Sequence, residues 1–253
     1  MSELTDCDVV VLCGGLGTRL QSVVKDRPKP MAEIHGRPFV SLVVDHYLRH
    51  GARRFIFSTG HRGEMIEEWF GRHRGSHDTM FIRDPTPLGT GGALARAMTL
   101  VRSNPVLVLN GDSLCEIDPS RLLRFHALKR ACATVAVTHQ EDRPDTGAVM
   151  LADDDRVLSI VEKPRIRVSG YDSAGIYVFD RSISSLFPSH SPWSLERYLL
   201  PKLVTQGFYG FVTASALYDI GTPDRLARFR DVWQETSAHL AIPSRNHAQG
   251  SVA

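Results

Sequence analysis

A glycine-rich segment near the amino terminus has the composition of a phosphate-binding loop. Residues 14–20 read GGLGTRL and follow an apolar run. Successive glycines let backbone N–H groups approach a phosphate that side chains would otherwise keep away. No Gly-Lys-Ser/Thr follows, so the segment is not a Walker loop, and Leu20 stands where the dinucleotide fingerprint has its third glycine. A tight turn would explain one or two of these glycines but not the adjoining Arg19.

Positive charge is concentrated in and after this loop. Residues 14–37 hold five basic side chains against two acidic ones, whereas the whole chain has 30 Lys and Arg against 28 Asp and Glu. Lys29 lies between Pro28 and Pro30, which restrict the backbone and reduce the entropy cost of holding its ammonium group in place. The local excess predicts a polyanionic ligand, which explains it better than a solvated surface does.

Two aspartates lie next to predicted strand and helix ends. Asp112 follows Gly111 directly after the apolar run 105–109, and Asp219 precedes the segment IGTP at 220–223. Each has a structural alternative, Asp112 as a turn residue and Asp219 as part of the entry to a helix. The place of Asp112 at the end of a predicted central strand favours ligand binding.

A zinc site receives little support from the sequence, because the eleven histidines are scattered and the four cysteines form no CxxC pair. We interpret the cysteines as structural thiols.

Strands and helices alternate over residues 8–112. Apolar runs typical of strands buried on both faces occupy residues 8–13, 54–58, 80–82 and 105–109. Apolar residues at helical spacing predict helices at 38–50, 65–70 and 91–101. This alternation indicates an open α/β sheet with right-handed crossovers, whose ligands lie beyond the carboxyl ends of the strands. The glycine loop and Asp112 both lie at such ends.

The second half of the chain is richer in strands. After a predicted helix at 120–130, strands are expected at 133–138, 147–151, 157–161 and 171–179, added antiparallel to the same sheet. Helices are expected at 194–204 and 223–233, around a strand segment at 208–220. No linker or repeat divides the chain. We therefore expect one domain over residues 1–236, with halves at 8–112 and 113–236, and a C-terminal tail at 237–253.

Composition narrows the class of protein. The chain is 42% hydrophobic and 23% charged, as in ordinary globular domains, and its net charge of +2 gives no general attraction to nucleic acid or anionic lipid. The first residues lack the pattern of a signal peptide, and no apolar run approaches the ~18 residues that a membrane helix needs. We expect a cytoplasmic protein with neither nucleic acid nor membrane as partner. A homo-oligomer is compatible with the sequence, which does not decide the oligomeric state.

Several segments, taken in order, resemble the sugar-1-phosphate nucleotidylyltransferases, also called nucleotide-sugar pyrophosphorylases. These segments are GGLGTRL at 14–20, PKPM at 28–31, PLGTGGA at 87–93, GD at 111–112, EKP at 162–164, AGIY at 174–177 and YDIGTP at 218–223. The resemblance covers about residues 8–233. It implies an α/β fold: a Rossmann-like mixed, mainly parallel sheet flanked by helices, with an inserted strand-rich sugar-binding portion.

The resemblance also implies a role for each matching residue. The residues with an implied catalytic role are Arg19, Lys29 and Asp112. The residues implied to bind the nucleotide are Leu12, Gly14, Gly15, Gly17, Thr18, Arg19, Pro87, Gly89, Thr90, Gly91 and Gly111. The residues implied to bind the sugar phosphate are Gly147, Glu162, Lys163, Ala174, Gly175 and Tyr177. Asp112 and Asp219 match the family's two metal-binding aspartates, which implies Mg²⁺ as cofactor. Many relatives carry Asn in place of Ala174, which favours a sugar other than the commonest hexoses.

The implied reaction joins a sugar 1-phosphate to a nucleoside triphosphate and releases pyrophosphate. The sugar phosphate is already largely anionic at pH 7, so the reaction needs charge neutralisation rather than a general base. The signature segments are most similar to the D-glycero-α-D-manno-heptose 1-phosphate guanylyltransferases, which make GDP-heptose for bacterial surface polysaccharides. Uridylyl-, thymidylyl- and mannose-1-phosphate guanylyltransferases are the alternatives in the family. An alternative of another class is a non-catalytic regulatory subunit that binds a nucleotide sugar, but Arg19, Lys29, Asp112 and Asp219 are all present, which disfavours it.

Overall fold

The structure is a computed structural model that describes residues 4–15, 17–20, 22–73, 75–139, 147–162 and 170–239. Four parallel strands form the first half of its central sheet, in the order β6 (Val106–Asn110), β1 (Asp8–Leu12), β4 (Arg54–Thr59) and β5 (Asp78–Arg83). All five residues of β1 are buried, because Val9 and Val11 pack into one hydrophobic cluster and Val10 and Leu12 into another on the opposite face. The four strands agree with the runs expected from the sequence.

Helices cover both faces of this sheet. The cluster that contains Val9 and Val11 receives side chains from α1 (Phe39–Arg49), α2 (Glu64–Arg72), α4 (Pro119–Lys129) and α6 (Pro223–His239). The other receives them from α3 (Gly89–Met98), the π-helical turn η5 (Leu195–Leu199) and α5 (Leu200–Leu203). Local sequence fixes the helix ends: Asp118 caps α4 by accepting hydrogen bonds from the Ser120 and Arg121 N–H groups, and Arg130 ends it in the left-handed conformation.

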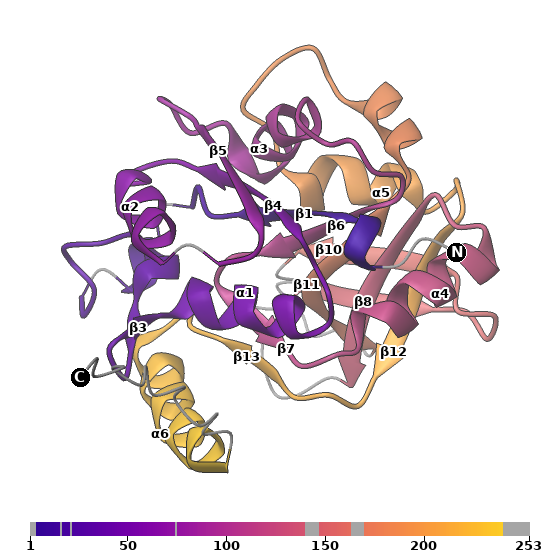
Figure 1. Ribbon diagram of the computed structural model, residues 1–253. Coiled ribbons are helices and arrows are strands. Elements are labelled where there is room, and N and C mark those ends of the chain that lie inside the picture. Colours follow the sequence, from indigo (N-terminus) through magenta and orange to yellow (C-terminus); the bar gives the residue numbers. More distant parts are fainter. Residues whose placement is uncertain are drawn as a thin grey trace, which may run out of the picture.

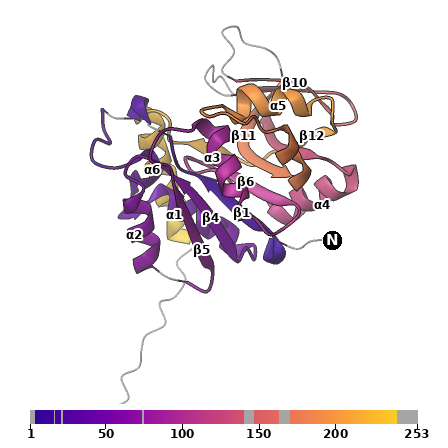
Figure 2. The same ribbon diagram turned by 90° about the horizontal axis from the view of Figure 1, so that it is seen from above.

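The second half continues the same sheet. β11 (Tyr171–Phe179) pairs antiparallel with β6, and β8 (Ala133–His139), β9 (Gly147–Leu151) and β10 (Val157–Glu162) extend the sheet by antiparallel pairing. β12 (Phe208–Thr213) is the exception, since it runs parallel to β8 after the crossover through η4 (Arg181–Leu186), η5 and α5. Figures 1 and 2 show the two halves side by side, with β4 and β5 at one end and β8 and β12 towards the other.

The sheet forks at β11. Ile176–Phe179 pair with β6, whereas Tyr171 and Asp172 pair with β9, so β6 and β9 lie one after the other along the same edge of β11. Between these two pairings the register with β8 shifts by a bulge, and Gly175 has φ +69°. A Cβ at Gly175 would lie 2.6 Å from the Asn110 side-chain nitrogen. The fork therefore leaves an opening between the end of β6 and the start of β9.

Four regions differ from the sequence expectation. The segment 208–220 forms two strands, because β13 (Leu217–Asp219) leaves the main sheet and pairs with β7 (Ser113–Cys115). The connection to residue 37 contains the short helices η2 (Thr18–Leu20) and η3 (Lys29–Met31) and the hairpin β2 (Glu33–Ile34) to β3 (Arg37–Pro38). The helix expected at 194–204 begins as a π-helical turn, and α6 continues to His239, past residue 237. The remainder of the expected tail lies outside the described residues.

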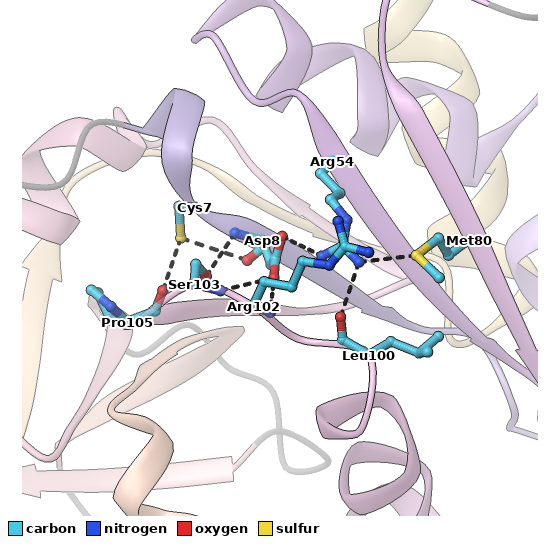
Figure 3. A network of polar contacts seen from close by, with 8 residues as sticks. All are labelled: Cys7, Asp8, Arg54, Met80, Leu100, Arg102, Ser103 and Pro105. Carbon is cyan, nitrogen blue, oxygen red and sulfur yellow. Dashed lines mark hydrogen bonds and ion pairs between the residues drawn. The ribbon is translucent and has the colours of Figure 1, made fainter.

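A polar network fixes the start of β1, at the end of this strand remote from the glycine loop. Figure 3 shows the residues of this network. The Asp8 carboxylate is buried, lies 2.6 Å from an Arg54 side-chain nitrogen and accepts hydrogen bonds from the backbone N–H groups of Arg102 and Ser103. Burial alone would raise the pKa of Asp8, but these hydrogen bonds together with Arg54 lower it below its ordinary value. The network ties β1 to β4 and to the connection that leads into β6. Over the described residues, no helix has the length and apolar character needed to cross a membrane.

Candidate active site

The loop after β1 packs directly against Lys29. Gly17 has φ +57°, and a Cβ at this position would lie 2.9 Å from the Lys29 Cβ. Glycine therefore allows both the left-handed backbone and the close approach of the lysine stem. Gly14 lies against the backbone of Gly60 at the end of β4, where the Cys13 N–H also donates to the Ser58 carbonyl at 2.8 Å.

Lys29 reaches the carboxylate of Asp112. It lies in the short helix η3, between two prolines, and its Nζ is 2.6 Å from Asp112 Oδ2. The lysine side chain is 13% exposed and that of Asp112 36%. The pair thus joins the basic segment after the loop to the end of β6, which are 83 residues apart in the chain.

Pairing of β7 with β13 brings Asp219 next to Asp112. Asp219 is opposite Ser113 in this ladder, and the Ile220 N–H donates to the Asp112 carbonyl at 3.2 Å. The Asp219 carboxylate accepts a hydrogen bond from the Gly221 N–H at 2.7 Å and lies 3.0 Å from an Arg225 nitrogen. A Cβ at Gly221 would lie 2.6 Å from Asp219 Oδ1 and 3.6 Å from Lys29 Nζ, which shows how closely these groups are packed.

The two aspartates fit the requirements of a magnesium ion. Mg²⁺ binds through one or two carboxylates and completes its shell with substrate phosphate oxygens and water. Asp112 and Asp219 are such a pair, held on adjacent backbone segments. No group of three or more His, Cys, Asp or Glu side chains that could hold a metal occurs among the described residues. A pair of carboxylates therefore suits a cation that completes its shell with substrate phosphate oxygens.

Two cavities meet at these residues. The larger has a volume of about 890 Å³ and extends along the carboxyl ends of β1, β4 and β5, where Leu12, Gly14, Gly15, Pro87 and Gly89 line it. The smaller, of about 150 Å³, lies at the fork of the sheet and is lined by Gly147, Ser173, Gly175, Tyr177 and Asp219. The residues common to both linings are Arg19, Lys29, Asn110, Asp112, Glu162 and Glu196. A ligand in each cavity would meet its neighbour at Lys29 and Asp112.

The segment 87–93 is shaped by Trp193. Cβ atoms at Gly89 and Gly91 would lie 2.3 Å from the Trp193 carbonyl oxygen and 2.0 Å from its ring. The Trp193 carbonyl also accepts a hydrogen bond from the Gly91 N–H at 3.0 Å. Gly91 is buried behind the wall of the larger cavity, whereas Gly89 and Thr90 line it. These glycines let the start of α3 lie against Trp193.

The smaller cavity receives most of the residues assigned to the sugar phosphate. Glu162 ends β10 opposite Gly147 on β9, and Gly175 and Tyr177 follow on β11. The Tyr177 hydroxyl lies 3.3 Å from Ser173 Oγ, and burial raises its pKa, so it stays protonated. Ala174 is buried in the core cluster on the other side of the sheet and is absent from the lining of this cavity. Lys163 lies outside the described residues.

A third hollow adjoins the glycine loop. Its volume is about 330 Å³, and it shares Gly15, Gly17, Lys29, His61 and Arg62 with the larger cavity. The basic residues that line it are Lys25, Arg27, Lys29, His61 and Arg62. Arg62, in the connection between β4 and α2, has φ +57°. Its side chain donates to the Lys25 carbonyl at 2.9 Å and so joins this connection to the basic segment that follows the glycine loop. Of the five basic residues at 14–37, Arg19, Lys25, Arg27 and Lys29 line one or more of the three cavities, whereas Arg37 pairs with Asp45 at 2.7 Å.

Comparison with known proteins decides the family. Residues 8–234 match the family model described as Nucleotidyl transferase. The chain belongs to the nucleotidyl transferase family. The resemblance noted in the sequence and the expected fold class are therefore confirmed.

Three relatives of this nucleotidyl transferase are each 32–33% identical to it. The mannose-1-phosphate guanylyltransferase of Mycobacterium tuberculosis is 33% identical over 225 residues, which cover 87% of this chain but only 63% of that protein. The D-glycero-α-D-manno-heptose 1-phosphate guanylyltransferase of Aneurinibacillus thermoaerophilus is 33% identical over 218 residues, which cover 86% of this chain and 94% of that one. The crystal structure of HddC from Yersinia pseudotuberculosis complexed with GMP-PN aligns with a TM-score of 0.79 and 32% identity, covering 90% and 99% of the two chains.

Sequence reasoning missed three polar residues of the nucleotidyl transferase site. Asn110 and Glu196 line both cavities, and Arg225 binds Asp219. Glu196 Oε2 accepts hydrogen bonds from Thr90 Oγ1 at 2.6 Å and Ser194 Oγ at 2.7 Å. Asn110 directly precedes Gly111 and could have been found as the end of a central strand. Glu196 and Arg225 carry no local signal, because they approach the site only through the packing of η5 and α6.

The cysteines behave as buried thiols. Cys7, Cys13, Cys115 and Cys132 are free, and the first three are buried. Burial raises the pKa of Cys7 and Cys115 to about 12 and that of Cys132 to about 11. At neutral pH these groups are therefore protonated and poorly suited to nucleophilic attack.

Proposed function

We propose that this protein transfers GMP from GTP to D-glycero-α-D-manno-heptose 1-phosphate, giving GDP-heptose and pyrophosphate in a magnesium-dependent reaction. The single observation that carries the proposal is the meeting of two cavities at Lys29 and Asp112. The larger cavity has room for a nucleoside triphosphate, and the smaller one is lined by hydrogen-bonding groups at the fork of the sheet. A transferase of this kind must hold two phosphorylated ligands with their reacting phosphates at a common boundary.

The charges at this boundary suit attack of one phosphate on another. Two anions must approach each other, and the leaving pyrophosphate accumulates further negative charge. Arg19 and Lys29 lie where both ligands would be in reach, and the basic hollow beside the glycine loop offers Arg62 and Lys25 to the leaving group. No side chain needs to remove a proton, because the attacking phosphate is already largely ionised at pH 7.

Before substrates bind, Lys29 neutralises Asp112, and Arg225 neutralises Asp219. Asp112 and Asp219 would hold Mg²⁺, and the Lys29 ammonium group beside Asp112 would lie within reach of a phosphate oxygen. The ion would supply charge neutralisation to the reacting phosphates.

The names of the relatives support guanine and heptose as the base and the sugar. One relative is a heptose 1-phosphate guanylyltransferase that this chain matches over 94% of its length. HddC was crystallised with GMP-PN and is matched over 99% of its chain. Mannose 1-phosphate is the second candidate, because the Mycobacterium tuberculosis enzyme is equally similar in identity, although the match covers 63% of its length. We place the reaction in the cytoplasm, in keeping with four free thiols and no disulfide.

A matrix of substrates tests this proposal. GTP, ATP, UTP and dTTP would each be combined with heptose, mannose and glucose 1-phosphates, with pyrophosphate release as the readout. GTP should exceed ATP and UTP in kcat/KM by ~10³ or more, because a mismatched base leaves buried polar groups unpaired. Heptose 1-phosphate should exceed the two hexose phosphates. A preference for UTP or dTTP would overturn the guanylyl assignment, and a preference for mannose 1-phosphate would overturn the heptose assignment.

A further inference from the structure

An arginine at the start of α6 contacts one of the two aspartates assigned to magnesium. Arg225 lies in the first turn of α6, and its Nη1 is 3.1 Å from Asp219 Oδ1 and 3.0 Å from Asp219 Oδ2. The side chain of Arg225 is 24% exposed and that of Asp219 18%. Because both side chains are largely buried, water and salt screen this contact less than they screen an ion pair on the open surface.

Lys29 brings a second positive charge to the same place. A Cβ atom at Gly221 would lie 3.5 Å from Arg225 Nη1 and 3.6 Å from Lys29 Nζ. The two cations therefore flank one small space beside the Asp219 carboxylate, which would be 2.6 Å from the same Cβ. A divalent ion bound there without a phosphate ligand would meet both positive charges at close range, where Coulomb repulsion is strong.

Arg225 also sets the charge balance of the smaller cavity. It lines this cavity and is absent from the lining of the larger one. The charged side chains of the smaller lining are four acidic ones, Asp112, Glu162, Glu196 and Asp219, and three basic ones, Arg19, Lys29 and Arg225. Without Arg225, four carboxylates would face two cations. A cavity of that charge would concentrate free divalent cations from solution.

We propose that Arg225 keeps the aspartate pair from binding a free divalent cation, so that Asp112 and Asp219 accept the ion as its complex with a nucleoside triphosphate. The inference rests on the proposed magnesium-dependent reaction and concerns the regulation of the same site. The positive charge of Arg225 repels a divalent ion without phosphate ligands, whereas the negative charges of a triphosphate offset that repulsion. Arg225 acts through Asp219 and is therefore a positioning residue.

The structural alternative is that Arg225 only holds the Asp219 carboxylate in place and ties α6 to β13. The two roles predict opposite effects of removing the charge. If Arg225 repels the free ion, its loss strengthens metal binding to the protein alone. If Arg225 only orients the carboxylate, its loss weakens that binding, because a mobile side chain loses more conformational entropy when it holds an ion.

The test measures Mn²⁺ binding to the full chain in the absence of any substrate. Electron paramagnetic resonance reports the free ion, and Mn²⁺ takes the same oxygen ligands as Mg²⁺. Arg225→Gln and Arg225→Met should each bind Mn²⁺ about 5-fold to 10-fold more tightly than the wild type. Arg225→Lys keeps the charge and should stay near the wild type. Arg228→Gln is the matched control, because Arg228 is an exposed arginine of the same helix, and it should leave the affinity unchanged.

An unchanged or weakened affinity in both neutral variants would overturn the role of Arg225 and leave the proposed reaction intact. An Arg225→Lys protein that binds Mn²⁺ as tightly as Arg225→Gln would also overturn it, since charge would then not decide. Adding Asp219→Asn to Arg225→Gln should abolish the tightened binding, and its persistence would show that the ion binds elsewhere and contradict the inference.

The wild type provides a criterion that needs no folded variant. A dissociation constant below about 10 µM for Mn²⁺ and the wild-type protein alone would contradict the inference, because sites that take up free divalent ions bind in that range. Failure of the proposed function would appear separately, as the absence of product with every substrate pair.

Discussion

At the scale of single residues, the site consists of two carboxylates, each held by a cation. Lys29 lies 2.6 Å from Asp112, and Arg225 lies 3.0 Å from Asp219. The four side chains come from the segment after the glycine loop, the end of β6, β13 and α6. This arrangement holds each carboxylate beside a cation before any ligand arrives.

Removing either carboxylate should lower turnover while leaving the fold intact. Asp112→Asn and Asp219→Asn keep the shape of the side chain but remove one charge from the expected magnesium site. We expect kcat to fall by on the order of 10²–10³. Steady-state kinetics over a range of Mg²⁺ concentrations would measure this, with thermal unfolding as a check on the fold. Wild-type activity in excess chelator, or an unchanged kcat in both variants, would contradict the assignment.

Arg19 and Glu162 should affect different kinetic constants. Contacts that strengthen in the transition state act on kcat, whereas contacts made equally in the ground state act on KM. Arg19 lines both cavities where charge develops, so Arg19→Ala should act mainly on kcat. Glu162 lies opposite Gly147 in the smaller cavity and is expected to bind sugar hydroxyls, so Glu162→Gln should mainly raise KM for the sugar phosphate. Initial rates with each substrate varied in turn would show whether this division is reversed.

Residues with local motifs were accessible from the sequence, and residues without them were not. Gly17, Lys29 and Asp112 belong to short segments whose spacing indicates phosphate and metal chemistry, and the structure brings them together around the larger cavity. Glu196 and Arg225 belong to no such segment. Their places depend on the packing of η5 and α6, which arises from contacts between distant parts of the chain. Lys163 lies outside the described residues, and its role stays a prediction.

At the scale of elements, the start of α3 and Trp193 shape one wall of the larger cavity. Gly91 is buried against the Trp193 ring, and Gly92 follows it in the same turn. The backbone N–H of Trp193 also donates to the Leu88 carbonyl at 3.0 Å. The wall therefore depends on contacts of α3 with a segment about one hundred residues later.

Gly91→Ala should disturb this wall. The added methyl group would lie 2.0 Å from the Trp193 ring, so α3 or the indole must move. We expect a destabilisation of roughly 1–3 kcal/mol and weaker nucleotide binding. Gly71→Ala is the matched control, because Gly71 lies in α2 with no atom within 4 Å of the added group, and it should be neutral or stabilising by about 0.5–1 kcal/mol. Denaturant unfolding and nucleotide titration of both variants would show whether Gly91→Ala behaves like its control.

Long apolar runs determined the elements that sequence reasoning found. β1, β4, β6 and β11 are buried on both faces, so their composition alone identifies them. β7 and β13 have three residues each, too few for a periodic pattern, and their pairing places Asp219 beside Asp112. The fork at β11 depends on where β6 ends and β9 begins, which single-strand patterns do not reveal.

At the scale of the whole molecule, one sheet joins both halves of the chain, and its core contains buried histidines. Desolvation lowers the pKa of His46 and of His126 to about 4. Their neutral rings are held by the Ile117 carbonyl at 2.8 Å and by Thr134 Oγ1 at 2.9 Å. In the unfolded chain the same groups titrate near 6.5. Between about pH 4 and about pH 6.5, therefore, the unfolded state binds more protons than the folded state.

Stability should therefore fall as the pH is lowered from about 6.5 to about 4. Each buried histidine contributes on the order of 3 kcal/mol, fully present above pH 6.5 and lost by about pH 4. His126→Gln should make this pH dependence shallower, whereas the exposed His190→Gln should leave it as in the wild type. Unfolding free energies from denaturant titration at several pH values would measure the slopes. A wild-type slope equal to that of His126→Gln would contradict the account.

The central claim is that one site joins a nucleotide to a sugar phosphate, and phosphorus NMR of a complete reaction tests it most directly. GTP, D-glycero-α-D-manno-heptose 1-phosphate and Mg²⁺ would be mixed with the wild-type protein or with Asp112→Asn. The account predicts that the wild type converts both substrates into a coupled diphosphate pair and an equal amount of pyrophosphate, only when both substrates are present, and that the variant forms these products at least 10²-fold more slowly. Hydrolysis of GTP independent of the sugar phosphate, or no diphosphate product at all, would contradict it.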